Sequence, residues 1–284
     1  PPGVLELSID VIPPVPWFLN KPFELTVGDH AVQSVFSTAA WTDSWRPLLG
    51  KLRDLWQAKQ PGRLLVAVAG PPGVGKSVFA EQLNWLVYKQ VLHHDAHSMA
   101  LPMDGFHFPN EYLKTHERKL PDGGAVKLID VKGQPDTIDV ANLRKHLEAL
   151  RARKDVVDWP GYSRFAHDVL PNKYRIPVIT NFVVVEGNYL LVDRGPFAGI
   201  PALFDVKIYV DGPAPMIMMK LMERHIKGGK TVEQAKDWVK RIDLPNARIA
   251  ESTKKSADVV VERDSENELA GIQWREEEGS APLP

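Results

Sequence analysis

Residues 64–77 read Leu-Leu-Val-Ala-Val-Ala-Gly-Pro-Pro-Gly-Val-Gly-Lys-Ser, and this stretch decides the fold. The first six residues form a continuous apolar run, which is typical of a strand buried on both faces of a parallel sheet. The next eight match the pattern G-x-x-x-x-G-K-[ST] in full, and a helical stretch follows them. A strand, a glycine-rich loop and a helix in this order predict a loop that binds the phosphates of a nucleotide.

The glycines of this loop let backbone N–H groups turn inward around phosphates, and the helix presents its positive end to them. Lys76 is expected to reach the β- and γ-phosphates, and the hydroxyl of Ser77 to ligate Mg²⁺. A glycine-rich turn with an exposed lysine is the structural alternative, and the flanking strand and helix argue against it. The predicted nucleotide-binding residues are Gly70, Pro71, Pro72, Gly73, Val74, Gly75, Lys76, Ser77 and Val78.

Outward from the loop, short apolar runs alternate with helical stretches along the chain. Alternation of strands and helices at this spacing implies crossover connections between parallel strands. We therefore predict an α/β fold of the P-loop NTPase type, with a doubly wound, mainly parallel sheet and flanking helices. Apolar runs recur at 99–101, 178–185, 206–210 and 257–261, and helices are expected at 76–90, 137–153, 213–227 and 231–242.

The ends of the chain differ in composition from its middle. The proline-rich first twenty-odd residues predict an arm, residues 23–36 predict a β-hairpin with its turn at Gly28-Asp29, and residues 45–56 predict a helix capped by Asp43 or Ser44. We expect an N-terminal appendage over 1–61, a P-loop domain over 62–262 and a flexible tail over 263–284.

Composition narrows the class of protein. The 284 residues carry a formal net charge of -1, which argues against a protein that coats nucleic acid. There is no cysteine, so disulfides, zinc–thiolate sites and cysteine nucleophiles are excluded. No apolar run is long enough to span a bilayer, and the first residues lack the pattern of a signal peptide. We expect a cytoplasmic enzyme that binds neither nucleic acid nor membrane, with a homodimer as the base-rate assembly.

Two acidic residues follow predicted strands. Glu186 ends an apolar run at 182–185, and Asp104 follows the run at 99–101. Open sheets bind ligands at the carboxyl ends of their strands. Glu186 is therefore expected to hold Mg²⁺ directly or through water, and Asp104 to orient an acceptor hydroxyl and accept its proton. An ordinary strand-end glutamate and a simple Asp-Gly turn are the structural alternatives.

Five motifs together carry a family resemblance. They are the loop at 70–77, Met-Asp-Gly-Phe-His at 103–107, Lys-Gly-Gln-Pro-Asp-Thr-Ile-Asp at 132–139, Trp-Pro-Gly-Tyr-Ser-Arg-Phe-Ala-His-Asp at 159–168 and Val-Val-Glu-Gly at 184–187. From about residue 62 to 262 the chain resembles the uridine kinase, phosphoribulokinase and bacterial pantothenate kinase family. Within that family it is most similar to a bacterial branch described as nucleoside/nucleotide kinase-like or as fructose-transport-system kinases. The resemblance implies that Asp104 is the catalytic base, that Glu186 belongs to the Mg²⁺ site and that a mobile lid spans about 220–245.

Basic and aromatic residues complete the predicted site. On the lid, Arg224 is expected to neutralise charge that develops on the transferred phosphoryl group; a solvated helix end, where cations are favoured anyway, is the alternative. This lid departs from the arginine-rich pattern of uridine kinases. The predicted substrate contacts are His107, Tyr162, Arg164 and His167, which suit a polyhydroxylated or anionic molecule. His167 could equally form a structural pair with the aspartate that follows it.

The predicted function is Mg²⁺- and ATP-dependent transfer of the γ-phosphate to a hydroxyl of a small soluble metabolite. Asp104, Lys76 and Arg224 are the predicted catalytic residues, and Ser77 and Glu186 the metal ligands. A sugar such as fructose is favoured as acceptor, and a nucleoside or pantothenate is the alternative on the same scaffold. An ATP-hydrolysing switch or interaction module is the alternative of another class. Asp104 argues against it, because a switch needs a positioned water rather than a base for an alcohol.

Overall fold

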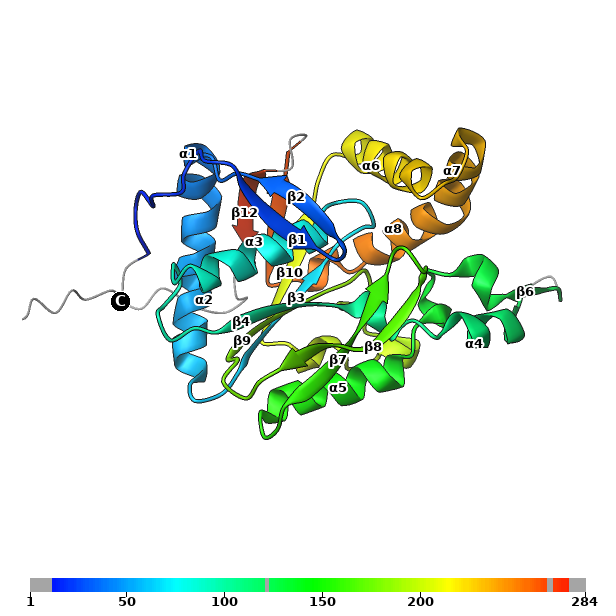
Figure 1. Ribbon diagram of the computed structural model, residues 1–284, viewed down its shortest axis with the longest axis horizontal. Helices are drawn as coiled ribbons and strands as arrows, with labels where there is room; N and C mark the ends of the chain where they lie inside the picture. The colour runs from blue at the N-terminus through cyan, green and yellow to red at the C-terminus, as the bar shows by residue number, and fades with distance from the viewer. Residues whose placement is uncertain (1–11, 121–122, 265–267, 276–284) are drawn as a thin grey trace, which may run out of the picture.

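The computed structural model describes residues 12–120, 123–264 and 268–275. Its centre is a six-stranded sheet in the order β12-β11-β10-β3-β9-β4 (Figure 1). Neighbouring strands from β11 to β4 pair in parallel, and β12 pairs antiparallel with β11. The predicted α/β fold with a mainly parallel sheet is confirmed. The strands are β3 (Leu64–Ala69), β4 (Ser98–Pro102), β9 (Phe182–Glu186), β10 (Val206–Asp211), β11 (Val259–Arg263) and β12 (Leu269–Trp274).

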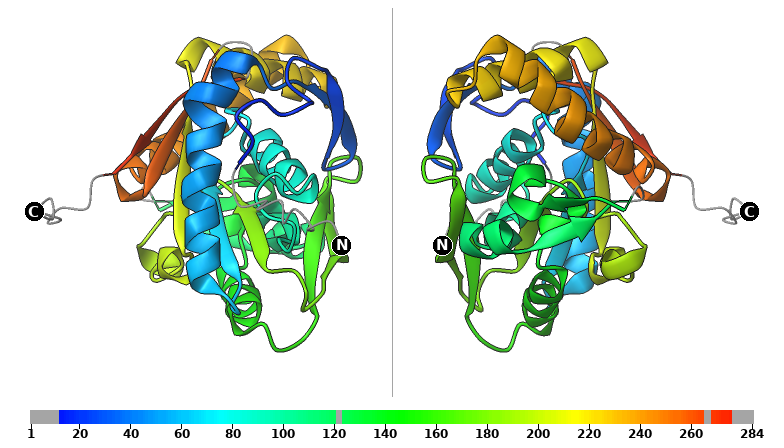
Figure 2. Two further views of the ribbon diagram at one scale, coloured as in Figure 1. Left: turned by 90° about the vertical axis from the view of Figure 1, so that its left-hand side faces the viewer. Right: turned by 90° about the vertical axis from the view of Figure 1, so that its right-hand side faces the viewer.

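The central strand β3 packs against helices on both of its faces. Leu64, Val66 and Val68 belong to one hydrophobic core with α2 (Arg46–Lys59) and α3 (Lys76–Tyr88). The alternate residues of β3 belong to a second core on the opposite face with α5 (Val140–Ala152) (Figure 2). Because both faces are covered, β3 is apolar throughout rather than alternating with polar residues.

In the described part of the chain, three small hairpins and five further α-helices lie outside the central sheet, and two of the hairpins reach its carboxyl end. The tip of the β1–β2 hairpin and the turn between β7 and β8 lie side by side there (Figures 1 and 2). The three two-stranded sheets are β1 (Phe23–Val27) with β2 (His30–Ser34), β5 (Glu117–Lys119) with β6 (Ala125–Lys127), and β7 (Val157–Ser163) with β8 (Asp168–Ile176). The other helices are α1 (Thr38–Ala40), α4 (Asn110–Thr115), α6 (Ala214–Lys227), α7 (Val232–Trp238) and α8 (Leu244–Glu251).

The N-terminal elements agree with the sequence in kind but not in every boundary. The hairpin expected at 23–36 is present, with its turn at Gly28-Asp29. The helix cap was predicted wrongly: the hydroxyl of Ser37 accepts from the backbone N–H of Ala40, and a π-helical turn at Trp41–Trp45 leads into α2. The predicted caps therefore lie inside a helical segment that begins earlier, because the apolar spacing used to locate the helix starts only at Trp45.

The flexible tail predicted over 263–284 is wrong for the residues that the structure describes. Leu269–Trp274 forms the edge strand β12, in which Trp274 lies opposite Val259 of β11. Leu269 is buried in the core. The charged neighbours of this short strand hide its apolar positions in the sequence. Residues 276–284 of the predicted tail, and residues 1–11 of the predicted arm, lie outside the described residues.

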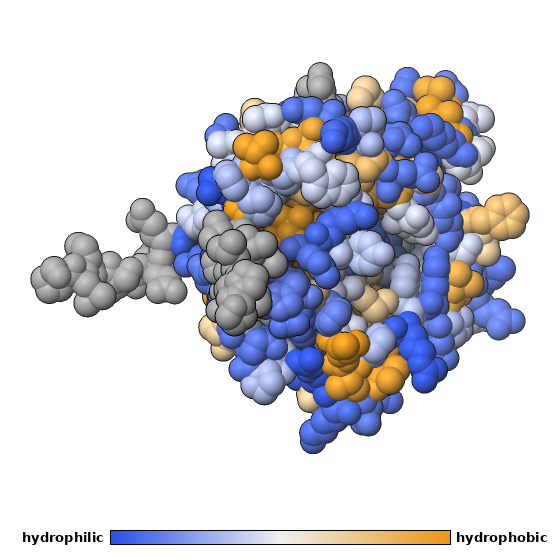
Figure 3. All heavy atoms as spheres, turned by 60° about the vertical axis from the view of Figure 1, so that its left-hand side comes forward, coloured by the Kyte–Doolittle hydropathy of each residue, from blue (hydrophilic) through white to orange (hydrophobic). Residues whose placement is uncertain are grey.

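Polar residues dominate one face of the molecule. On the face drawn in Figure 3, hydrophilic side chains predominate and apolar ones form separate patches. The exposed large apolar side chains include Trp17, Tyr88 and Phe165, which are far apart in the sequence. Among the described helices, none combines the length and the apolar character that a membrane crossing requires.

Candidate active site

The loop between β3 and α3 has the geometry of a phosphate cradle. Gly70, Gly73 and Gly75 have φ values of +149°, +85° and +94°, which turn the backbone around the loop. A Cβ on Gly73 would lie 2.8 Å from the side chain of Leu221 on α6. Gly73 is therefore required both by its backbone conformation and by the close approach of α6.

The carboxyl end of β9 brings Glu186 beside the first residues of α3. Glu186 lies opposite Val68 in the parallel pairing of β9 with β3. The hydroxyl of Ser77 donates a 2.8 Å hydrogen bond to Oε1 of Glu186, and Nζ of Lys76 donates a 2.8 Å hydrogen bond to the carbonyl oxygen of Pro71. A hydroxyl and a carboxylate in contact offer the hard oxygen ligands that Mg²⁺ prefers. The residues present thus fit a nucleotide with its metal ion.

Burial controls the charge of this group of residues. Desolvation lowers the pKa of Lys76 to about 8, although the nearby Glu186 and Asp104 oppose the change. Burial raises the pKa of Glu186, and the proximity of Asp104 raises it further, while Lys76 acts in the opposite direction. Bound phosphates would favour the charged lysine and a bound cation the ionised carboxylate, so ligand binding relieves the cost of burying both charges.

Asp104 lies at the next strand end along the sheet. It sits in the 3-10 turn Met103–Phe106 after β4, whose last residue, Pro102, pairs with Glu186. Strand pairing therefore sets Asp104 close to Glu186, and both line one inner cavity together with Ser77. The turn packs closely against β7. A Cβ on Gly105 would lie 2.9 Å from the backbone N of Gly161, so there is no space for a side chain at this position.

Three of the four predicted substrate contacts gather around this cavity. Tyr162 and Arg164 line it, and His107 lines the larger cleft that adjoins it. The pKa of His107 is lowered by burial, and its Nδ1 lies 3.1 Å from the carbonyl oxygen of Thr137. His167 lines neither cavity. Its carbonyl oxygen accepts a 2.8 Å hydrogen bond from Nζ of Lys132. His167 thus supports the β7–β8 turn rather than the cavity wall.

The larger cleft connects the phosphate loop to the helices after β10. It has a volume of about 370 Å³, which is within the range of small-molecule sites. Arg224 on α6 lines it, and its Nη2 donates a 3.0 Å hydrogen bond to Oδ1 of the buried Asp243. Nε2 of His225 lies 2.6 Å from Oδ2 of the same carboxylate. Asp243 therefore fixes the position of the arginine that was predicted to act on the phosphates.

Several residues that line the cavities were not predicted from the sequence. Lys220, one turn before Arg224 on α6, and Glu81, one turn after Ser77 on α3, both line a cavity, and the i, i+4 spacing could have identified them. Lys132 is the first residue of the motif at 132–139. Its Nζ donates a 2.6 Å hydrogen bond to Oδ1 of Asn110 and lies 5.0 Å from the ring centroid of Tyr162. Nothing in the sequence signals that Val27, on the N-terminal hairpin, also lines both cavities.

Fold and site together define a P-loop kinase. Residues 65–270 match the model of the Phosphoribulokinase / Uridine kinase family. The chain belongs to this family, and it is an ATP-dependent phosphotransferase that acts on a small molecule. The predicted family and enzyme class are confirmed.

Two relatives and one solved structure illustrate the similarity. The chain is 31% identical over 250 residues to the uncharacterized protein YggC of Escherichia coli (strain K12), a match that covers 86% of this chain and 96% of that protein. It is 30% identical over 213 residues to the pantothenate kinase of Halalkalibacterium halodurans, covering 72% of this chain and 64% of that enzyme. The crystal structure of a putative fructose transport system kinase from Silicibacter sp. TM1040 is similar with a TM-score of 0.63 at 29% identity, covering 75% of this chain and 98% of that one.

Proposed function

We propose that this protein transfers the γ-phosphate of Mg²⁺–ATP to a hydroxyl of a small sugar or polyol, with Asp104 as the base. The observation that carries the proposal is the meeting of Asp104, Ser77 and Glu186 in one cavity at the end of the phosphate loop. A carboxylate at this position can contact an acceptor hydroxyl while the phosphate lies in the loop. ATP and Mg²⁺ are the proposed nucleotide and metal, and Ser77 and Glu186 the proposed ligands of the metal.

The proposed reaction forms a bond between the acceptor oxygen and the γ-phosphorus and breaks the bond from that phosphorus to the bridging oxygen of ADP. Asp104 accepts the hydroxyl proton as the new bond forms. Backbone N–H groups of the loop and the charge of Lys76 hold the phosphates. Arg224, oriented by Asp243, offsets the charge that develops on the transferred group. Bound Mg²⁺ supplies further neutralisation of phosphate charge.

The charges around the inner cavity favour an uncharged acceptor. Glu81, Asp104 and Glu186 line it, and Arg164 is the cation among its lining residues. Burial raises the pKa of Glu81 to about 7, so this carboxyl repels an anion only in part near neutral pH. The carboxylate of an acceptor such as pantothenate would find one cation, Arg164, in this lining, whereas the hydroxyls of a sugar can donate hydrogen bonds to ionised carboxylates and accept them from protonated carboxyls. The similarity to a structure described as a putative fructose transport system kinase is additional support for fructose. A nucleoside stays the alternative, because Tyr162 and Tyr174 also line the cavity.

A panel of acceptors tests the proposal. The purified protein is incubated with Mg²⁺–ATP and, separately, with D-fructose, other hexoses, linear polyols, nucleosides and pantothenate, and ADP formation is followed together with the ³¹P NMR spectrum of the product. We expect a phosphorylated hexose or polyol. A phosphorylated nucleoside or pantothenate would overturn the acceptor class, and ADP formation that no acceptor stimulates would replace the kinase by an ATP-hydrolysing switch.

A further inference from the structure

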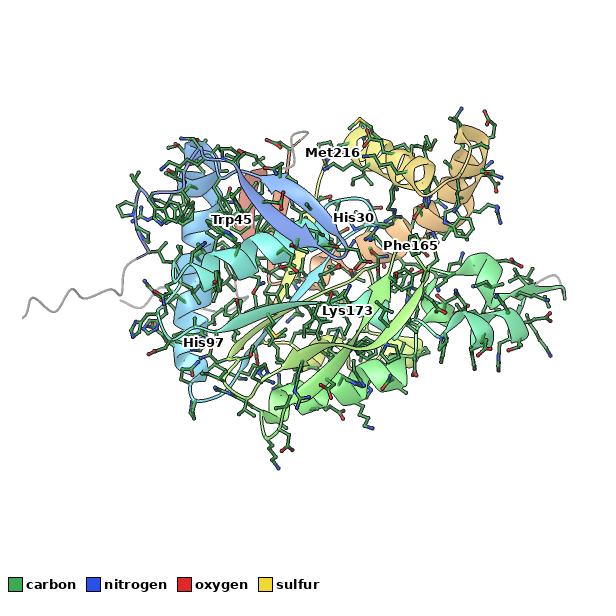
Figure 4. The ribbon with its side chains drawn as sticks, viewed as in Figure 1. His30, Trp45, His97, Phe165, Lys173 and Met216 are labelled. Atoms are coloured by element: carbon green, nitrogen blue, oxygen red, sulfur yellow. The ribbon has the colours of Figure 1, made fainter. Side chains whose placement is uncertain are left out.

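The N-terminal β1–β2 hairpin reaches the candidate active site although it precedes the segment matched by the family model, residues 65–270. Val27 and Gly28 line the inner cavity, and Val27, His30 and Val32 line the larger cleft. Figure 4 shows His30 on this hairpin, with Phe165 and Lys173 of the β7–β8 hairpin close by. Two hairpins from distant parts of the chain thus meet at the mouth of the cavity.

The base of the hairpin is fixed to the helix that follows the phosphate loop. The ring of Phe23 stacks on that of Trp85 in α3 with centroids 4.3 Å apart. Nε2 of Gln82, also in α3, donates a 2.9 Å hydrogen bond to the hydroxyl of Ser34, and both side chains are buried. These contacts hold the strands of the hairpin in a constant position relative to Ser77 at the start of α3.

The tip of the hairpin is tied to the other wall of the cavity. Oδ1 of Asp29 lies 2.8 Å from Nζ of Lys173 in β8, and Oδ2 accepts a 3.4 Å hydrogen bond from the backbone N–H of Arg164. The hydrogen bond from Lys173 also lowers the pKa of Asp29. One carboxylate thus joins the hairpin tip to the turn that carries Arg164, a proposed acceptor contact.

We propose that the hairpin tip is the closing wall of the acceptor pocket and that the Asp29–Lys173 ion pair holds this wall in place. Asp29 and Lys173 are then positioning residues, which limit the acceptor to a small molecule and keep water away from Asp104. This inference rests on the proposed kinase function. Water exclusion matters because a water molecule beside the base could accept the phosphate instead of the acceptor. An exposed ion pair contributes little to folding, so its loss should open the pocket without unfolding the protein.

The test compares Lys173→Met with a matched control, Lys207→Met. Lys207 forms an ion pair of nearly the same length and exposure with Asp258, 3.0 Å long with the lysine 24% exposed, against 2.8 Å and 23% for the Lys173 pair. Its position near the start of β10 is at the opposite end of the sheet from the site. The first measurement is ADP formation from Mg²⁺–ATP with no acceptor present. We expect Lys173→Met to raise it about fivefold, as the loss of one exposed ion pair allows, and Lys207→Met to leave it unchanged.

The second measurement exchanges the charges of Asp29 and Lys173. Asp29→Lys and Lys173→Asp alone should each raise the acceptor-independent hydrolysis and the KM for the sugar phosphorylated fastest in the acceptor panel, with little change in the KM for ATP. The double exchange restores the ion pair with reversed polarity but not the hydrogen bond that Oδ2 of Asp29 accepts from the backbone N–H of Arg164, so it should return both values part of the way toward wild type. Circular dichroism and the melting temperature verify that each variant is folded.

The outcomes separate this inference from the proposed function. A wild-type protein that phosphorylates no member of the panel overturns the kinase proposal, and acceptor-independent hydrolysis then still reports on the wall. Wild-type transfer together with Lys173→Met values equal to those of Lys207→Met overturns the role of the hairpin. Impaired single variants that the double exchange does not rescue overturn the ion pair as the element that holds the wall.

Discussion

At the scale of single residues, Glu81 couples the acceptor cavity to pH. Burial raises the pKa of its carboxyl from 4.5 to about 7, and a hydrogen bond from Asn84 opposes this. The unfolded chain loses this proton near pH 4.5 and the folded protein only near pH 7, so the folded state binds the proton more tightly. The associated stabilisation is complete below about pH 4.5 and is lost as the pH rises to about 7, by at most about 3 kcal/mol.

Glu81→Gln should remove this pH dependence, because the amide does not ionise. We expect the free energy of unfolding of the variant, relative to wild type, to rise between pH 5 and pH 7 and to level off above pH 7. Urea denaturation at a series of pH values measures it. Parallel profiles for the two proteins would show that the carboxyl of Glu81 titrates normally in the folded state.

At the scale of elements, the phosphate loop depends on the close packing of α6 against Gly73. Gly73→Ala places a methyl group 2.8 Å from Leu221 and 3.1 Å from the carbonyl oxygen of Ile217 at a φ of +85°. Gly123→Ala is the matched control, because Gly123 has a φ of +87° and nothing within 4 Å of the added methyl group. We expect Gly73→Ala to lower the free energy of unfolding by about 1–3 kcal/mol more than the control does, and to weaken binding of ATP analogues in calorimetry. Equal effects of the two variants would mean that only the backbone conformation matters.

The proposed lid acts through Arg224. Arg224→Met removes the guanidinium that Asp243 orients toward the cleft, and we expect kcat to fall about 10²- to 10³-fold with a small change in the KM for ATP. Arg241→Met is the control, since Arg241 lies in the same segment but its pair with Asp237 is exposed. A steady-state comparison of the two variants checks the assignment. If Arg224→Met and Arg241→Met had similar kcat values, Arg224 would be a structural partner of Asp243 and not a catalytic residue.

The sequence predicted those elements whose signal is local. The strand, loop and helix around Lys76 were expected because the glycine spacing and the apolar run lie within fourteen consecutive residues. Glu186 was expected because it directly follows an apolar run, and Asp104 because it lies three residues after the end of another. The early helix start at Ser37 was missed because a π-helical turn precedes the apolar spacing, and β12 because charged residues surround a short edge strand.

The parts of the site that depend on tertiary packing could not be predicted. Val27 enters the cavity only because Phe23 packs on Trp85 and Asp29 pairs with Lys173, and neither contact leaves a pattern in the sequence. His167 has the right chemistry beside the right motif, but the turn directs its carbonyl group, rather than its imidazole, into the observed contacts. A residue type near a motif thus indicates a role only when the backbone also presents the side chain to the site.

At the scale of the whole molecule, the N-terminal segment shares one core with the P-loop domain. Trp45 is buried and stacks on Phe79 of α3 with ring centroids 5.2 Å apart, in a core that also contains Val66 of β3. We propose that residues 12–61 and the domain after them unfold together. Trp45→Ala should lower the free energy of unfolding by about 3–5 kcal/mol while urea denaturation keeps a single transition by circular dichroism and fluorescence. Trp17→Ala, at a side chain 67% exposed, should change it by less than about 0.5 kcal/mol; two separate transitions would contradict a shared core.

The proposed kinase depends on Asp104 as the group that accepts the proton of the acceptor hydroxyl during phosphoryl transfer. The most direct test of this role is the rate of acceptor-dependent ADP formation by Asp104→Asn, measured beside wild type and beside Asp158→Asn, an exposed aspartate on β7. We expect Asp104→Asn to lower kcat by about 10²- to 10⁴-fold with normal binding of Mg²⁺–ATP, and Asp158→Asn to keep wild-type activity. An Asp104→Asn protein that phosphorylates the acceptor at the wild-type rate would contradict this role.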